Sequence, residues 1–321
     1  MNLALKTHYK HSERRSIDYY KDLGDQQRAA ATTDYVGPAL VLAGAGAGKT
    51  RTIVYRIAYT IQMGTDSSRI MLVTFTRKAA ANMMSQLASL AGINERTFWG
   101  GTFHHLANRM LRQHAHHLGY TNDFTILDPE DSKDLVSIAA EEIPAPPGGV
   151  RVPRAKDIRE IISKVINTGA SIEDVVLVNW GQYSKLIPWI ESVAETYGKK
   201  KLASNCMDFD DLLVNQLRLL REVPLTRSHW LGSFDSVLVD EYQDTNLLQA
   251  EILDELASPH RNLWAVGDDC QSIYKFRGAN YANILEFPKR YPDLKVFLVE
   301  KNYRSAKCLK RFVPLYLDNL V

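Results

Sequence analysis

The sequence predicts an α/β protein in which a parallel sheet is flanked by helices and an all-helical region is inserted into the chain. Three observations predict this class. In two parts of the chain, short apolar runs alternate with segments of helical periodicity, as is typical of a parallel sheet covered on both faces. A glycine-rich turn joins the first apolar run to the helical segment after it. Between about Leu111 and Lys199 the periodicity is mostly helical, with no comparable apolar run.

Five apolar runs are expected to form strands. The first, ALVLAG, begins at Ala39 and leads into the glycine-rich turn. The others are IMLVTF, SVLVD, LWAVGD and KVFLV, at residues 70–75, 236–240, 263–268 and 295–299. After the turn, Ile53, Ile57 and Ile61 recur at helical spacing, and a helical stretch through Ala91 follows the second strand.

The middle of the chain is expected to be a separate helical unit. Residues 141–156 read EEIPAPPGGVRVPRAK, and their four prolines and paired glycines predict a loop. The segment YGKKKLASN, at residues 197–205, marks the expected end of the insertion. We therefore expect residues 1–110 and 200–299 to form one discontinuous α/β domain and residues 111–199 to form the helical insertion.

Composition and residue spacing argue against a disulfide-rich protein, a zinc ribbon and a membrane protein. Lys plus Arg number 39 against 37 for Asp plus Glu, so net charge does not indicate a nucleic-acid partner. The three cysteines, Cys206, Cys270 and Cys308, lack CxxC spacing, which argues against a disulfide framework or a zinc ribbon and fits the reducing cytoplasm. No apolar run approaches the roughly 20 residues needed to cross a bilayer, so no membrane partner is expected.

The glycine-rich turn has the pattern of a phosphate-binding P-loop. Residues 43–50 read AGAGAGKT, with alanine at the first of the usual glycine positions. Small residues let backbone N–H groups surround phosphate oxygens at the start of a helix. The residues expected to bind nucleotide here are Ala43, Gly44, Ala45, Gly46, Ala47, Gly48, Lys49 and Thr50. Lys49 would reach the β- and γ-phosphates, and the Thr50 hydroxyl would ligate Mg²⁺.

A second motif supplies carboxylates. In VLVDEYQDTN, the apolar residues 237–239 place Asp240 and Glu241 at the carboxyl end of a strand, where ligands bind in open α/β sheets. Asp240 suits the coordination shell of Mg²⁺, and Glu241 suits a general base that orients the attacking water. The alternative is that the two acids have no catalytic role and simply begin the loop that follows the strand. Together with the P-loop, the pair predicts a P-loop NTPase that uses Mg²⁺.

Seven ordered motifs resemble those of the UvrD/Rep-type superfamily 1 DNA helicases. They are LGDQQRAA, AGAGAGKT, TFTRKAAANM, GTFHHL, VDEYQDTN, VGDDCQSIYKFRGAN and EKNYRS, and they span about Leu23 to Ser305. The resemblance implies a first RecA-like domain with an inserted helical subdomain, ATP as the nucleotide, and single-stranded DNA as a partner. Gly24, Arg77, Cys270 and Lys301 depart from the residues usual in these motifs, and Phe276 replaces the usual Trp.

The resemblance also implies further ATP contacts. Gln27 would read the edge of adenine and Tyr303 would stack on it. Arg51 would lie against the base, although a surface role is an equal alternative. Gln271 would sense the γ-phosphate, and Arg304 would stabilise charge there.

Other positions are implied to bind single-stranded DNA. Tyr274, Phe276 and Phe75 would stack on bases, which tolerates any sequence. The remaining implied contacts to phosphate or sugar are Arg277, Thr74, Thr102 and His104. The alternatives are an ion pair for Arg277, core packing for the aromatics, and helix capping or core filling for Thr102 and His104.

By the resemblance, the chain is the N-terminal part of a 3′→5′ helicase that translocates on single strands and unwinds duplex junctions. Motifs V and VI are not found, so the second RecA-like domain is expected to be missing, with residues 300–321 forming its start. A truncated form of a longer protein, weakly active or inactive alone, is therefore expected, and a natural short form is the alternative. The alternatives are a non-motor, ATP-responsive DNA-binding module and a helicase–nuclease subunit of the RecB or AddA kind.

Three polar clusters receive structural interpretations. The histidines at positions 104, 105, 114, 116 and 117 favour a polar helix face over a zinc site. The acids of MDFDDLL, residues 207–213, favour the opening turn of a helix over Mg²⁺ coordination. The lysines of GKKK, residues 198–201, favour a solvated loop over a contact to duplex phosphates.

Overall fold

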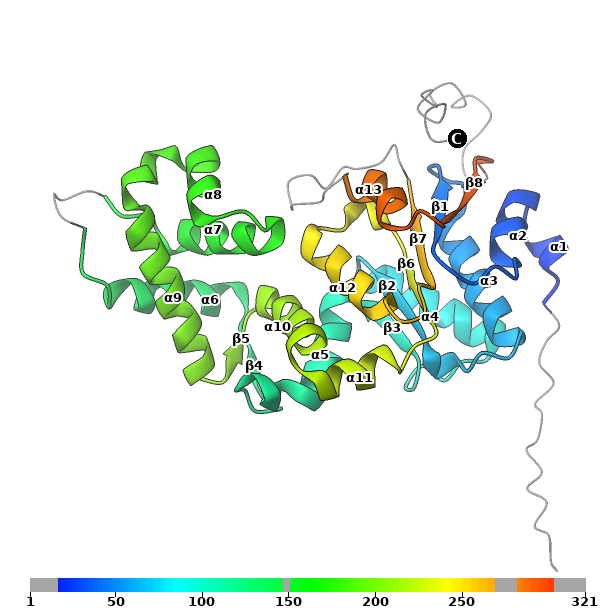
Figure 1. Cartoon of the computed structure of the whole chain (residues 1–321), viewed down its shortest axis with the longest axis horizontal. Coiled ribbons are helices and arrows are strands. Elements are labelled where there is room, and N and C mark those ends of the chain that lie inside the picture. Colours follow the sequence, from blue (N-terminus) through cyan, green and yellow to red (C-terminus); the bar gives the residue numbers. More distant parts are fainter. Residues whose placement is uncertain (1–16, 147–150, 269–281, 303–321) are drawn as a thin grey trace, which may run out of the picture.

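The computed structural model describes residues 17–146, 151–268 and 282–302. Its centre is a parallel six-stranded sheet in the order β3-β2-β6-β7-β1-β8 (Figure 1). The strands are β1 (Ala39–Ala43), β2 (Ile70–Thr74), β3 (Trp99–Thr102), β6 (Ser236–Val239), β7 (Leu263–Gly267) and β8 (Lys295–Val299). Helices cover both faces, so the predicted α/β class is confirmed.

Neighbouring residues of each strand enter different cores. In β1, Leu40 packs with one buried cluster and Val41 with the other. This alternation follows from the two-residue period of a strand. One cluster contains α2 (Asp25–Ala31), α3 (Lys49–Gln62) and α4 (Arg77–Ala91). The other contains α5 (Phe103–His114), α10 (Phe209–Glu222), α11 (Pro224–Leu231), α12 (Leu247–Ala257) and α13 (Ala282–Arg290). A short helix, α1 (Tyr19–Asp22), precedes them.

The five expected strands form within a residue of their predicted ends, but β3 was not expected. It pairs with β2 from Met71↔Trp99 to Thr74↔Thr102. Its sequence, WGGT, has no apolar run, and both glycines lie close to neighbouring side chains. A Cβ on Gly100 would lie 2.3 Å from Sδ of Met84, and one on Gly101 would lie 2.6 Å from Cδ2 of His105.

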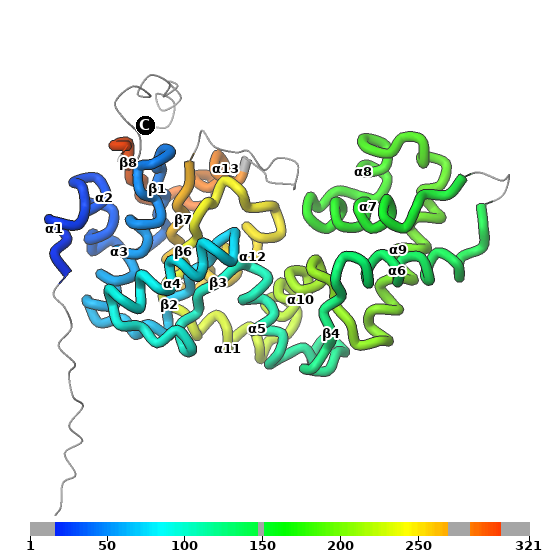
Figure 2. Tube along the Cα trace, turned by 180° about the vertical axis from the view of Figure 1, so that it is seen from behind, coloured from blue at the N-terminus to red at the C-terminus, as the bar shows by residue number. Residues whose placement is uncertain are grey.

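The middle of the chain forms a helical group beside the sheet (Figure 2). It contains α6 (Pro129–Glu141), α7 (Ala155–Thr168), α8 (Ile172–Asn179) and α9 (Ile187–Ala203). Two buried clusters lie wholly within these helices and their connections. The range expected to be all-helical also contains a two-residue strand, β4 (Thr125–Ile126), which pairs in parallel with β5 (Cys206–Met207). The structure assigns no helix or strand to residues 142–146 and 151–154, within the expected loop.

Two expectations for polar segments have different outcomes. The acids of MDFDDLL open α10, where Asp208 and Asp211 form a reciprocal cap, as expected. The loop interpretation of GKKK is wrong, because these residues continue α9 and Lys201 is buried. The loop prediction assumes that all three lysines are exposed to solvent, whereas Lys201 is buried. In the described residues, no helix is long and apolar enough to span a membrane.

Candidate active site

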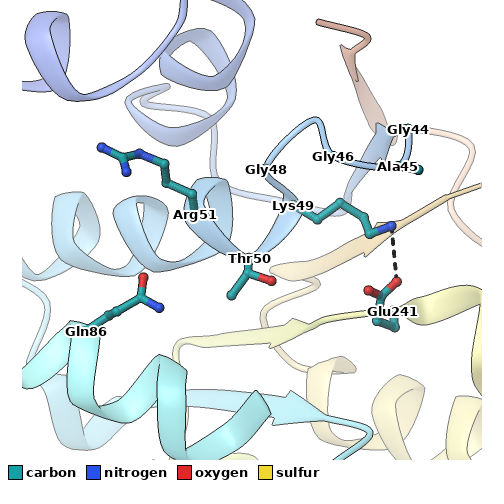
Figure 3. A pocket seen from close by; sticks show the side chains of 9 residues that line it. All are labelled: Gly44, Ala45, Gly46, Gly48, Lys49, Thr50, Arg51, Gln86 and Glu241. Carbon is teal, nitrogen blue, oxygen red and sulfur yellow. Dashed lines mark ion pairs between the residues drawn. The ribbon is translucent and has the colours of Figure 1, made fainter. Parts of the chain in front are cut away.

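The P-loop connects β1 to α3 at the carboxyl end of the sheet. Gly46 and Gly48 have φ values of +76° and +88°, in the left-handed region that favours glycine. The turn is closed by a 3.0 Å hydrogen bond that Ala47 N donates to Gly44 O. A pocket of about 390 Å³ opens at this loop (Figure 3). It is lined by Gly44, Ala45, Gly46, Gly48, Lys49, Thr50, Arg51, Gln86 and Glu241.

Gln27 supports the loop from α2. Its side-chain Nε2 donates to Ala47 O at 2.7 Å, and its Oε1 accepts from Gly24 N at 3.1 Å. A Cβ on Gly48 would lie 2.4 Å from Gln27 Nε2. The glycine at position 48 is therefore required both by its φ angle and by the close approach of Gln27. Whether Gln27 also reads adenine stays a prediction.

Three adjacent strands bring the charged groups together. Because β7 lies between β6 and β1, the residues after their carboxyl ends meet at the P-loop. Lys49 Nζ lies 3.3 Å from Glu241 Oε2 and 3.5 Å from Asp268 Oδ2. Lys49 and Asp268 are both buried. The structure therefore places the expected phosphate-binding lysine and the expected base in one ion-paired group (Figure 3).

Asp240 directly follows β6 and is almost fully buried. Burial, and then the nearby charge of Glu241, raise the pKa of Asp240 to about 7. A hydrogen bond from Glu241 N, the charge of Lys49 and the nearby Thr50 hydroxyl oppose that rise. The carboxylate of Asp240 and the hydroxyl of Thr50 are therefore close to each other beside the pocket. Mg²⁺ usually takes one or two protein oxygens and completes its octahedron with phosphates and waters, so Asp240 and Thr50 fit such an ion.

Gln243 was missed by the sequence analysis. Its Nε2 donates to Glu241 Oε2 at 2.7 Å, and its Oε1 accepts from Asp268 N at 3.0 Å. It therefore joins the carboxylate expected to act as base to the end of β7. Gln86 on α4 was missed as well, and it lines the pocket near Arg51 and Thr50 (Figure 3). Its exposed helical position gives no sequence signal, whereas Gln243 lies only two residues after Glu241.

Of the residues expected to contact DNA, those that the structure describes lie at the carboxyl ends of β2 and β3. Thr74 is buried, and its hydroxyl donates to Thr76 O at 3.2 Å. Phe75 is half-buried, with its ring edge-on to Phe103 at 6.2 Å between centroids. Thr102 caps α5 by accepting from His105 N at 3.3 Å. These contacts match the alternative capping and packing roles, and DNA binding by these residues stays a prediction.

The remaining expected positions differ in what the structure describes. Half-buried His104 lies edge-on to Phe209 on α10, and burial lowers the pKa of His104. Arg51 is exposed and its Nε donates to Asp22 O at 3.0 Å. The residues that lie outside the described residues are Gln271, Tyr274, Phe276, Arg277, Tyr303 and Arg304. Among the described residues, no group of three or more His, Cys, Asp or Glu side chains could hold a metal ion.

Comparison with known proteins agrees with this geometry. Residues 23–292 match the UvrD/REP helicase N-terminal domain. The chain is 38% identical over 298 residues to the ATP-dependent DNA helicase PcrA of Bacillus subtilis strain 168. The aligned region covers 92% of this chain and 39% of that protein.

Two staphylococcal proteins with the same name give similar values. Identity to PcrA of Staphylococcus epidermidis strain RP62A is 36% over 286 residues, covering 88% of this chain and 38% of that protein. Identity to PcrA of Staphylococcus aureus strain Mu50 is 35% over 288 residues, covering 89% and 38%. The chain thus spans about two fifths of the length of the curated relatives it matches. Because the domain match includes most of its residues, the chain belongs to the UvrD/REP helicase family and contains that family's N-terminal domain.

Proposed function

We propose that this chain is the ATP- and single-stranded-DNA-binding part of an ATP-dependent 3′→5′ DNA helicase. In the complete protein, ATP hydrolysis would drive translocation on a single strand and unwinding at a duplex junction. The observation that carries the proposal is the ion-paired group of Lys49, Glu241 and Asp268 at the P-loop pocket. The relatives named above are ATP-dependent DNA helicases, which supports the same class of reaction.

The chemistry follows from the groups at the pocket. Backbone N–H groups of residues 44–50 would hold the phosphates, and Lys49 would exchange its ion pairs for contacts to the β- and γ-phosphates. Asp240 and Thr50 would hold Mg²⁺, which neutralises phosphate charge. Glu241, once released by Lys49, would orient the attacking water. Gln271 and Arg304 would complete the γ-phosphate contacts, and Tyr303, Gln27 and Arg51 would hold the base.

The proposed DNA surface lies beside the nucleotide. Strand β2 is hydrogen-bonded to β6, and Asp240 and Glu241 directly follow β6. Thr74, Phe75, Thr102 and His104 lie at the ends of β2 and β3. With Tyr274, Phe276 and Arg277 they would bind a single strand through stacking and backbone contacts. Adjacent strands of one sheet would thus hold both ligands.

We propose that residues 1–110 and 200–299 form the RecA-like ATP-binding domain, that residues 111–199 form the insertion, and that residues 300–321 begin a second RecA-like domain. The two buried clusters confined to α6–α9 support the separate insertion. Translocation needs a second RecA-like domain in cis, and the greater length of the relatives supports its presence in the complete protein. Residues 1–321 alone should therefore hydrolyse ATP slowly.

Glu241→Gln tests the proposal. The substitution keeps the shape and the hydrogen bond from Gln243 but removes the base, so single-turnover hydrolysis of γ-labelled ATP should fall by about 10²–10⁴-fold. Affinity for a fluorescent ATP analogue with Mg²⁺ should stay within about threefold, whereas Lys49→Ala should abolish binding. Glu251→Gln is the control, since Glu251 pairs with Arg221 on the surface at 2.7 Å. Undiminished turnover in Glu241→Gln would remove Glu241 as the base.

A further inference from the structure

The loop after β6, residues 240–246, is held by α13 at two points, and the first is Asn283. Asn283 is 2% exposed. Its Nδ2 donates to Thr245 O at 2.9 Å and to Asn246 O at 3.2 Å, and lies 3.2 Å from Thr245 Oγ1. The Thr245 hydroxyl in turn donates to Tyr242 O at 2.7 Å. One buried amide therefore fixes the far end of the loop that carries Glu241.

The second point is Arg290, at the other end of α13. Its guanidinium donates to the Tyr242 hydroxyl and forms an ion pair with Asp254 of α12. The Tyr291 hydroxyl also donates to Asp254 Oδ1, at 2.7 Å. Tyr242 is fully buried, and its ring lies edge-on to Phe287 at 5.2 Å. Helix α13 lies beside α12 near the end of β7 (Figure 1), and its Arg290 contacts Tyr242, the residue directly after Glu241.

The loop needs such support because its conformation is strained. Glu241 has a φ of +52°, in the left-handed region that residues with a Cβ seldom adopt. Strained conformations of this kind persist only where their surroundings hold them, and they cluster at functional sites. Within the loop, Gln243 and the ion pair from Lys49 hold the Glu241 carboxylate. When Lys49 turns to phosphate, the supports from α13 and Gln243 remain.

We propose that Asn283 and Arg290 are positioning residues for ATP hydrolysis. They hold the strained loop so that the Glu241 carboxylate faces the attacking water once Lys49 has left it. This inference rests on the proposed function of Glu241 as the base. Neither side chain lines the nucleotide pocket, so their loss should change the hydrolysis step and leave nucleotide affinity in place.

Asn283→Ala tests the proposal, with Asn262→Ala as its matched control. Asn262 is also a buried asparagine, and its Nδ2 donates to Asp235 O at 2.9 Å. It directly precedes β7, so it lies at the amino ends of the strands, whereas the P-loop lies at their carboxyl ends. Both variants lose one buried amide and should lose similar thermal stability. Single-turnover hydrolysis of γ-labelled ATP and affinity for a fluorescent ATP analogue would be measured on residues 1–321 with oligothymidylate present.

We expect Asn283→Ala to lower the hydrolysis rate at least about tenfold with analogue affinity within about twofold, and Asn262→Ala to change neither. An unchanged rate in Asn283→Ala would overturn the proposal, as would equal rate losses in both variants. If Asn283→Ala does not fold, Arg290→Met decides by the same criteria, because the Arg290 side chain is 28% exposed. Failure of the parent chain to bind the analogue would instead overturn the proposed function and this inference with it.

Discussion

Gly48 shows how one residue shapes the nucleotide pocket. We predict that Gly48→Ala weakens binding of a fluorescent ATP analogue at least about tenfold. The added Cβ meets Gln27 Nε2 at 2.4 Å and must displace either the amide or the loop. The left-handed φ of +88° adds a backbone cost of about 1–2 kcal/mol.

Gly92→Ala is the control for a left-handed glycine outside the pocket. Gly92 also has a left-handed φ, of +64°, but a Cβ there would meet nothing within 4 Å. Gly92→Ala should therefore lower the free energy of unfolding by about 1–2 kcal/mol while leaving analogue affinity unchanged. Equal affinities for Gly48→Ala and the parent chain would show that Gln27 does not constrain the loop.

For single residues, the sequence predicts which residue types form the site, but it does not predict which of them contact one another. The P-loop and the Asp240–Glu241 pair follow from their chemistry and from the strands before them. The link from Gln243 to Asp268 depends on β7 lying between β6 and β1, and strand order cannot be read from apolar runs. The strain at Glu241 likewise becomes visible only once the backbone is placed.

Between the elements α9 and α10, a buried ion cluster joins the helical group to the α/β part. Lys201 Nζ lies 2.8 Å from Asp208 Oδ2 and 2.6 Å from Asp211 Oδ2, and the Tyr197 hydroxyl donates to Asp208 at 2.7 Å. Burial, and then the charge of Asp208, raise the pKa of Asp211 to about 6. One cation therefore neutralises two carboxylates in a largely buried site, where each carboxylate depends on it.

We predict that Lys201→Met destabilises the protein by about 3–5 kcal/mol at pH 7 and by less at pH 5. Without the cation, both carboxyl pKa values rise above their unfolded value of about 4, so the folded state binds protons more readily. Stability then falls as pH rises through that window. Urea unfolding at the two pH values measures the difference.

Lys199→Met is the control on the same helix. Lys199 is exposed and pairs with exposed Glu195 at 2.6 Å, so its loss should cost no more than about 0.5 kcal/mol at either pH. A Lys201→Met variant as stable as Lys199→Met, or equally destabilised at both pH values, would contradict the account of this junction.

The elements that the sequence failed to predict share a physical cause. The strand β3 reads WGGT, whose two glycines lie against Met84 and His105 and give no apolar run, and its pairing with β2 makes it a strand. The lysines at the end of α9 give a polar sequence. The carboxylates that pair with buried Lys201 come from the next helix, so the sequence of α9 alone does not show the burial. Both outcomes depend on tertiary neighbours, whereas the five expected strands are signalled by their own residues.

At the scale of the whole molecule, one sheet is proposed to hold two ligands. The nucleotide pocket lies at the ends of β1 and β6, and the described DNA contacts that we propose lie at the ends of β2 and β3. Since β2 is hydrogen-bonded to β6, a change at Glu241 has a short path to Thr74 and Phe75. Binding of each ligand should therefore change the affinity for the other by the same factor.

The affinity of residues 1–321 for a labelled oligothymidylate of about 16 nucleotides tests this claim most directly. It would be measured by fluorescence anisotropy without nucleotide and with saturating Mg²⁺ and a non-hydrolysable ATP analogue. We predict dissociation constants that differ at least about fivefold between the two conditions, and no difference in Lys49→Ala. Equal dissociation constants in the parent chain, with the analogue shown to be bound, would contradict it.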